Sequence, residues 1–225
     1  MARFTVSAVA QKSPEWFAAR AGRLTGSSAD AILAKPRKGA EESVQRRDYR
    51  LRLACERLTG QSQEEDVHLS ADMQRGNACE PQARAAYEIA TGHLVLESGF
   101  LSLVDAMAGC SLDGHVGDFA GIVEIKCPKT ATHLAYVEAG TVPADYLPQI
   151  THNLWVSGAQ WCDFISYDDR IGEELALFVV RVPRDEAVIA AYVAEAEKFL
   201  AEVDAKVGGI QALKAKRQQA AREAA

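Results

Sequence analysis

The chain has 225 residues, of which 48% are hydrophobic and 25% charged, a composition typical of a folded globular domain with a sizeable core. No run of 18 apolar residues is present, so the sequence predicts no membrane span, and the net charge of −6 argues against a passive nucleic-acid coating protein. Scattered cysteines without a C-x-x-C pair predict reduced thiols in a cytoplasmic protein, and neither disulfides nor a zinc site.

The first 91 residues are predicted to be mostly helical. The segment SPEWFAAR begins a helix, with Ser13 as the N-cap and Pro14 at the first helical position. Further helices are expected to follow in chain order: a short one that stops before Pro36, and longer ones over 41–59 and 71–91. In the last of these helices, Pro81 predicts a first turn or a kink.

Basic residues gather in this helical part, whereas much of the acidic charge lies elsewhere in the chain. For any single member the ordinary interpretation is a solvated helix face. Taken together they predict a basic front on an acidic protein: Arg20, Arg23, Lys35, Arg37, Lys38, Arg46, Arg47, Arg50 and Arg52.

From residue 93 the hydrophobic period becomes that of strands. Strands are predicted within 93–105, 107–116, 120–128, 159–168 and 174–183, and helices over 131–139, 145–157 and 185–203. This order predicts a single α/β or α+β domain, residues 1–225, with a central mixed β-sheet flanked by helices. Its expected parts are a helical N-terminal part (13–91), a sheet core (93–182) and C-terminal helices (185–225).

The stretch GCSLDGHVGDFAGIVEIKCP, residues 109–128, brings three charged residues into one hairpin-like segment. Side chains alternate along a strand, so Glu124 and Lys126 share one face, whereas Ile125 points into the core and leaves its carbonyl near them. If the two halves of the segment pair, Asp113 reaches the same face. Two carboxylates and a carbonyl suit Mg²⁺ or Mn²⁺, and a lysine beside them suits metal-assisted hydrolysis. The alternative is a solvent-facing E-x-K pair after a common Asp-Gly turn.

Five sequence blocks resemble the lambda-type phage exonucleases, or YqaJ-like viral recombinase family, of the PD-(D/E)xK nuclease superfamily. They occur in family order between residues 16 and 158: WFAARAGRLTGSS, MQRGNACEPQARAAYE, CSLDG, VEIKCP and YLPQITHNLWVSG. Leu112 replaces the usual proline before Asp113, a departure that leaves the carboxylate in place. The resemblance implies a restriction-endonuclease-like core.

The resemblance also implies roles for individual residues. Asp113, Glu124 and the carbonyl of Ile125 would bind metal, and Lys126 would handle the attacking water. Glu80 would approach from its helix, Gln149 would lie near the water or the scissile phosphate, and Tyr146 would flank them at the rim. Arg20 and Ser27 would hold a terminal 5′-phosphate, in keeping with the bidentate chemistry of guanidinium and the free N–H groups of a helix start. Plain helix-surface, N-cap and rim packing are the alternatives for Glu80, Ser27 and Tyr146.

The implied activity is a Mg²⁺-dependent 5′→3′ exonuclease that acts processively on double-stranded DNA ends, releases mononucleotides and leaves a 3′ single strand for annealing. Two ions are expected, and Mn²⁺ would substitute. The resemblance further implies a homotrimeric ring around DNA and a phage single-strand annealing protein as partner. Two alternatives stay open at this point: a structure-specific or restriction-type endonuclease on the same metal core, and a non-catalytic DNA-binding protein.

Overall fold

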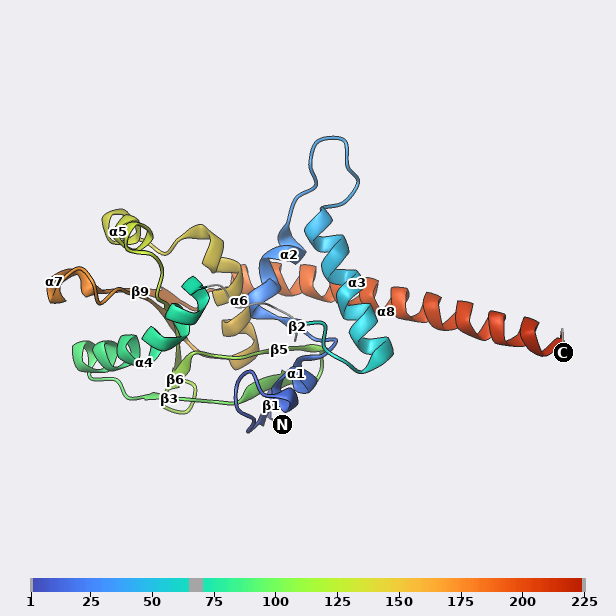
Figure 1. The fold of residues 1–225 in the computed structure, drawn as a ribbon, viewed down its shortest axis with the longest axis horizontal. Helices are drawn as coiled ribbons and strands as arrows, with labels where there is room; N and C mark the ends of the chain where they lie inside the picture. The colour runs from blue at the N-terminus through green and yellow to red at the C-terminus, as the bar shows by residue number, and fades with distance from the viewer. Residues whose placement is uncertain (1, 65–70, 224–225) are drawn as a thin grey trace.

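The computed structural model describes residues 2–64 and 71–223, without the side chains of 71–73. Figure 1 shows a sheet-containing body from which one long helix projects. The expected connection over residues 65–70 lies outside the described part. The strands are β1 (Phe4–Ser7), β2 (Leu24–Thr25), β3 (Val95–Leu96), β4 (Phe100–Leu103), β5 (Ala108–Cys110), β6 (Gly114–Val116), β7 (Gly121–Lys126), β8 (Trp161–Tyr167) and β9 (Leu177–Pro183).

Helices cover both ends of the sheet body. They are α1 (Pro14–Arg20), α2 (Ala29–Leu33), α3 (Val44–Thr59), α4 (Ala71–Thr91), α5 (Thr130–Ala139), α6 (Leu147–Ser157), α7 (Glu173–Ala176) and α8 (Glu186–Glu223), with 3-10 turns η1 (Gly26–Ser28) and η2 (Ala144–Tyr146). The α+β class predicted from the pattern is confirmed. As expected, the Ser13 hydroxyl caps α1 by accepting from the backbone N–H of Trp16.

The strands form two mixed sheets rather than one. The larger has the order β3-β6-β7-β8-β9, in which only β7 and β8 run parallel, and the smaller has the order β1-β4-β5-β2. The predicted strands 93–105 and 107–116 each divide and contribute one piece to each sheet. The first break lies at Gly99, where an added Cβ would sit 1.7 Å from the Ser7 carbonyl oxygen, so the backbones approach too closely for any other residue.

One local expectation was wrong, because the start of the last predicted strand, Glu174–Ala176, belongs to α7. Of the two predictions for Pro81, the first turn is excluded, because Pro81 lies in the middle of α4. The C-terminal part is helical as predicted, but as one helix that continues unbroken through Gly208 and Gly209 to Glu223. Strong helix formers in the tail, Ala, Lys, Arg and Gln, explain its length.

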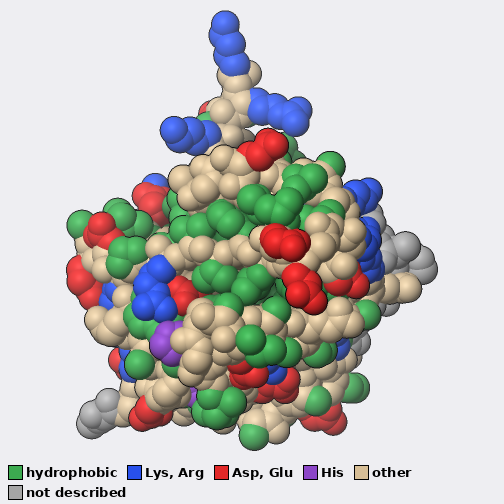
Figure 2. All heavy atoms as spheres, turned by 90° about the vertical axis from the view of Figure 1, so that its left-hand side faces the viewer, with side chains coloured by type: hydrophobic (Ala, Val, Ile, Leu, Met, Phe, Trp, Pro, Cys, Tyr) green, Lys and Arg blue, Asp and Glu red, His purple; other side chains and the backbone are tan. Residues whose placement is uncertain are grey.

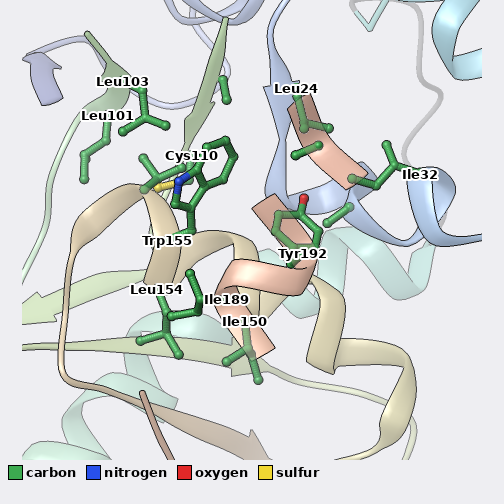
Figure 3. Close-up of a cluster of buried hydrophobic side chains, with 14 of the residues drawn as sticks. Leu24, Ile32, Leu101, Leu103, Cys110, Ile150, Leu154, Trp155, Ile189 and Tyr192 are labelled. Carbon is green, nitrogen blue, oxygen red and sulfur yellow. The ribbon is translucent and has the colours of Figure 1, made fainter. Parts of the chain in front are cut away.

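Helix α6 runs through the centre of the main core. Figure 3 shows Trp155 of α6 next to Cys110 of β5, and Leu154 and Ile150 of α6 near Ile189 of α8. From α8, Ile189 and Tyr192 join this core. Helix α6 also supplies residues to the candidate site described below, so its packing in the core fixes the position of that site.

The distal end of α8 leaves the body. Its 38 residues span roughly 57 Å at the rise of an α-helix, and the last buried residue is Val203. Beyond it the exposed charges are mainly basic: Lys206, Lys214, Lys216, Arg217 and Arg222. In the part of the chain that the structure describes, no helix combines the length and apolar character that crossing a membrane requires.

A buried histidine in this core makes stability depend on pH. His152 donates from Nε2 to the Gly109 carbonyl at 2.9 Å, and its Nδ1 accepts from the Tyr192 hydroxyl at 2.8 Å, so the ring is satisfied as a neutral tautomer. Burial lowers the pKa of His152 to about 4. Above pH 6.5 the ring is neutral in the folded and in the unfolded protein. As the pH falls from 6.5 towards 4, only the unfolded chain gains the proton, and the contribution of this ring to the free energy of unfolding falls by about 3 kcal/mol.

We therefore expect His152→Gln to show a lower slope of unfolding free energy against pH between pH 4.5 and 6.5 than the unmodified protein, and to be less stable than it at pH 7.5. Urea unfolding at several pH values measures this slope, and the half-buried His93 provides the control variant His93→Gln. An unchanged slope in His152→Gln would remove the buried ring as the cause.

Candidate active site

The pairing of β6 with β7 brings Asp113 opposite Glu124. The two strands are antiparallel with Gly114 facing Val123, so the next position along the ladder places Asp113 beside Glu124. The Asp113 Oδ2 accepts from the backbone N–H of Ile125 at 2.7 Å, which holds the carboxylate against β7. The hairpin-like pairing predicted for this segment is therefore present.

Glu124 lies at the centre of a polar cluster. Its side chain is 1% exposed, and its Oε1 accepts from Lys126 Nζ at 2.5 Å and from Gln149 Nε2 at 2.7 Å. Its other oxygen accepts from Asn153 Nδ2 at 3.1 Å. Gln149 and Asn153 are four residues apart on α6 and so share one helix face. Every donor in this cluster is aimed at one buried carboxylate.

Burial is the largest influence on the pKa values of this cluster, and neighbouring charges modify it. Burial raises the pKa of Glu124 to about 7, Lys126 opposes the shift, and Asp113 adds to it. Burial lowers the pKa of Lys126, but the Glu124 and Asp113 carboxylates outweigh this and raise it overall. The lysine is therefore an ammonium that donates hydrogen bonds. Its Nζ also lies 5.3 Å from the centre of the Tyr146 ring.

A third carboxylate approaches from α4. Burial, and then the charge of Asp113, raise the pKa of Glu80. Arg84, one turn further along α4, lies 3.6 Å from Glu80 and donates to the backbone carbonyl of Asp113 at 3.0 Å. Glu80, Arg84 and Asp113 line a cavity of about 440 Å³, together with Gln11 and Glu97. This cavity opens the carboxylate cluster to solvent.

The donor set fits a hard divalent cation. Asp113, Glu124 and the Ile125 carbonyl are oxygen donors, and burial, with a smaller contribution from the Asp113 charge, raises the pKa values of Glu80 and Glu124. Among the described residues, no three His, Cys, Asp or Glu side chains stand at ligating separation. Glu124 is instead engaged by Lys126, Gln149 and Asn153. Mg²⁺ needs few protein ligands, because it keeps several waters.

Arg20 and Ser27 form a second polar pocket near the first. The Arg20 side chain is 8% exposed, stacks 4.1 Å over the Trp16 ring, and donates from Nη2 to Ser27 Oγ and from Nη1 to Ser111 Oγ, both at 3.4 Å. Trp16 donates from Nε1 to the same Ser111 hydroxyl at 2.8 Å. A planar guanidinium and two hydroxyls converge here, as an anion site requires.

The two polar clusters are joined by a short bridge. A Cβ at Gly26 would lie 2.4 Å from Asn153 Oδ1, so the turn that carries Ser27 packs directly on the residue that binds Glu124. On the other side, Ser111 is two residues from Asp113 in the chain. Only glycine at position 26 permits this approach.

Sequence reasoning did not identify all of these residues. Asn153 carries a signal in its four-residue spacing from Gln149, and Arg84 has the same spacing from Glu80. Ser111 lies within the quoted CSLDG block. Glu64, which binds Arg20 Nη2 at 2.9 Å, lies outside every sequence block and carried no signal.

The architecture around these clusters is that of an exonuclease fold. The solved structure of LHK-Exo, an alkaline exonuclease from Laribacter hongkongensis, matches with a TM-score of 0.81 and 40% identity, over 91% of this chain and 99% of that one. A second structure of LHK-Exo, in complex with dAMP, matches equally. A phage-related exonuclease from Haemophilus somnus 129PT shares the fold with a TM-score of 0.63 and 15% identity, over 84% of this chain and 96% of that one.

The family follows from the sequence itself. Residues 15–160 match the model of the YqaJ-like viral recombinase domain, and this range contains both polar clusters. The chain therefore belongs to the YqaJ-like viral recombinase family, in agreement with the resemblance of its five sequence blocks. No curated protein matches the chain.

Proposed function

We propose that the protein is a metal-dependent DNA exonuclease that binds the 5′-phosphorylated end of a duplex and hydrolyses that strand in the 5′→3′ direction. The observation that carries this proposal is the contact of the Gly26 turn with Asn153, which puts an anion pocket beside a carboxylate–lysine cluster. A terminal phosphate held by Arg20 and Ser27 would leave the neighbouring phosphodiester at Glu124 and Lys126. The product would then be a mononucleotide, the class to which the dAMP bound by LHK-Exo belongs.

Asp113, Glu124 and the Ile125 carbonyl would hold Mg²⁺, with Glu80 close by and with Mn²⁺ as a substitute. When bound, such ions, of which we expect two, lower the pKa of water and offset charge on the phosphoryl oxygens. Lys126 and Gln149 meet at Glu124 Oε1, so both are within reach of a water at that oxygen. The ammonium of Lys126 would orient the water and stabilise developing negative charge, rather than accept a proton.

Basic surface residues would contact the duplex outside the site. The loop between α2 and α3 rises above the body, and Figure 2 shows basic side chains at its tip. Lys35, Arg37 and Lys38 of this loop are all exposed. Such contacts neutralise phosphates without reading sequence, which suits an enzyme that degrades any duplex.

From the family we further propose a homotrimeric ring that threads DNA, acts processively, and works in the cytoplasm with a phage single-strand annealing protein. A ring would keep a protein of net charge −6 on DNA by topology. The exposed end of α8 beyond Val203 supports an assembly, because a helix of this length gains little stability without packing.

A strand-specific digestion tests the proposal. One linear duplex is labelled at either the 5′ or the 3′ end of one strand and incubated with and without Mg²⁺, beside a closed circular duplex. We expect Mg²⁺-dependent release of labelled mononucleotides from the 5′ end alone, and no cutting of the circle. Cutting of the circle would favour an endonuclease, and no cleavage with Mg²⁺ or Mn²⁺ would favour a DNA-binding protein.

The phosphate pocket makes its own prediction. Arg20→Ala should lower the preference for 5′-phosphorylated over 5′-hydroxyl ends to about one, because a buried guanidinium–phosphate contact contributes roughly ten-fold or more. Initial rates on the two substrates measure the ratio. Lys198→Ala is the control, since Lys198 is exposed and lies outside the basic front. An unchanged ratio in Arg20→Ala would contradict the assignment of the pocket.

A further inference from the structure

The carboxylate of Glu64 lies inside the pocket assigned above to a terminal phosphate. Its Oε2 accepts from two nitrogens of Arg20, from Nε at 3.0 Å and from Nη2 at 2.9 Å. Its Oε1 lies 3.3 Å from Arg52 Nη2. One anion with two oxygens therefore bridges two guanidinium groups, which is how arginine pairs bind phosphate.

Arg52 has the features of a further anion-binding residue. Its Nη2 donates to Ser28 Oγ at 3.1 Å, next to Ser27, and its guanidinium lies 4.7 Å over the Tyr49 ring. Its Nε is buried and has no hydrogen-bond partner among the described residues. Stacking on Tyr49 thus holds the Arg52 side chain in place, and its Nε–H remains available as a donor.

An open cavity reaches Arg52. It measures about 370 Å³ and is lined by Ser27, Ser28, Tyr49 and Arg52, with Asp30 and Asp48 also on its wall. An anion could therefore approach Arg52 and Ser27 from solvent, and Arg52 is joined through Glu64 to Arg20. The acidic wall residues would repel anions, so an anion would bind at the two guanidinium groups and not along the wall.

Burial explains why an internal carboxylate is present. The Arg20 side chain is 8% exposed, and a buried cation without an anion is strongly destabilising. Glu64, 18% exposed, provides that anion in the free protein. A phosphate at the same place would carry more negative charge and more acceptor oxygens, so it could replace the carboxylate without leaving Arg20 unpaired.

We propose that Glu64 occupies the terminal-phosphate pocket in the free protein and is displaced by the 5′-phosphate of a DNA end, and that Arg52 is the second arginine of this pocket. This inference rests on the proposed function, through the assignment of Arg20 and Ser27. A 5′-hydroxyl end brings no charge to compete with Glu64, so the carboxylate stays in place. The carboxylate thereby keeps Arg20 paired in the free protein and lowers the affinity for phosphorylated ends, which must displace it.

Binding measured without metal tests the inference separately from cleavage. The full chain and three variants, Glu64→Gln, Arg52→Gln and the surface control Lys198→Gln, are titrated in EDTA with short duplexes that carry a 5′-phosphate or a 5′-hydroxyl. Each is also titrated with inorganic phosphate, with the rise in its own Tm as the readout. This second readout is insensitive to a change in basal stability, because each variant is its own reference.

We expect Glu64→Gln to bind the phosphorylated duplex and inorganic phosphate roughly ten-fold more tightly, since the competing charge is gone. Arg52→Gln should lose roughly the same factor for both ligands, while the control keeps both affinities. Weaker or unchanged phosphate binding in Glu64→Gln would show that the carboxylate is a structural partner of Arg20, and would overturn the inference.

The proposed function and this inference fail in different ways. If the unmodified protein prefers phosphorylated ends and Glu64→Gln sharpens that preference, the inference holds even when no metal supports cleavage. If the unmodified protein cleaves DNA from its 5′ ends but Glu64→Gln leaves phosphate affinity unchanged, the function stands and the inference fails. Equal affinity of the unmodified protein for both duplexes would overturn the inference outright.

Discussion

Glu124→Gln is expected to abolish cleavage while making the metal-free protein more stable above pH 7. Activity should fall by at least about 10³-fold, because the variant loses a charged oxygen ligand and the transition-state stabilisation that the bound ion supplies. The shape of the side chain is kept. Its neighbours Lys126, Gln149 and Asn153 stay in place, so the loss reports on charge and not on packing.

The gain in stability follows from the sign of the pKa shift. Burial raises the pKa of Glu124 to about 7, against an ordinary value of 4.5. Between these values the folded state holds a proton that the unfolded chain has released, so stability falls as the pH rises through this window. Above pH 7 the buried charge is a constant cost, which glutamine removes. Asn153 Oδ1, buried without a partner among the described residues, offers the new amide an acceptor if Asn153 turns over.

Two measurements check this prediction: nuclease rates with Mg²⁺, and urea unfolding in EDTA at pH 6 and pH 8. The unmodified protein should be less stable at pH 8 than Glu124→Gln, and the two should converge towards pH 5. The exposed Glu138 provides the control Glu138→Gln, which should change neither quantity. Retained activity in Glu124→Gln would exclude this carboxylate from the site. Asp113→Asn should likewise lose cleavage, as the second of the two ligands.

Lys126→Ala is expected to lose turnover but to bind DNA ends as the unmodified protein does. Asn153 separates the pocket of Arg20 and Ser27 from Glu124 and Lys126, so binding of a terminal phosphate does not involve the lysine. Removing a positioned ammonium that stabilises transition-state charge should lower kcat roughly 10²- to 10⁴-fold. End affinity in Ca²⁺, which is expected to occupy the site without supporting hydrolysis, should change less than about three-fold.

Single-turnover cleavage and equilibrium binding separate these two effects. The exposed Lys198 provides the control Lys198→Ala, which removes an equal charge away from the site. Lys126→Arg should not restore the rate, because a planar guanidinium cannot take the place of a compact ammonium beside Glu124 Oε1. A Lys126→Ala variant that turns over normally would assign the handling of water to another group.

The side chains of β7 that share a face could be predicted from sequence, because alternation along a strand does not depend on the rest of the fold. That rule placed Glu124 and Lys126 on one face and Ile125 on the other. Pairing of the two halves of the 109–128 segment was likewise expected to bring Asp113 to the same face, and the antiparallel register of β6 and β7 places it opposite Glu124. Helix caps and stop signals predicted α1 for the same reason, since each acts within a few residues.

The division into two sheets could not be predicted in this way. The runs 93–105 and 107–116 have the period of single strands, yet each divides between the sheets. What divides them is contact with partners far along the chain: β4 pairs with β1, and β3 and β6 continue the sheet of β7. No pattern within one strand records which strand will lie next to it.

Sequence alone determined the α+β class, the charged face of β7 and, through five blocks in order, membership of the family. Only the tertiary structure decided that Asn153 binds Glu124, that the Gly26 turn packs on Asn153, and that Glu64 occupies the pocket of Arg20. The reason is physical. Strand alternation and helix capping act over a few residues. The stability of a buried carboxylate instead depends on which hydrogen-bond donors from distant parts of the chain the fold brings within about 3 Å of it.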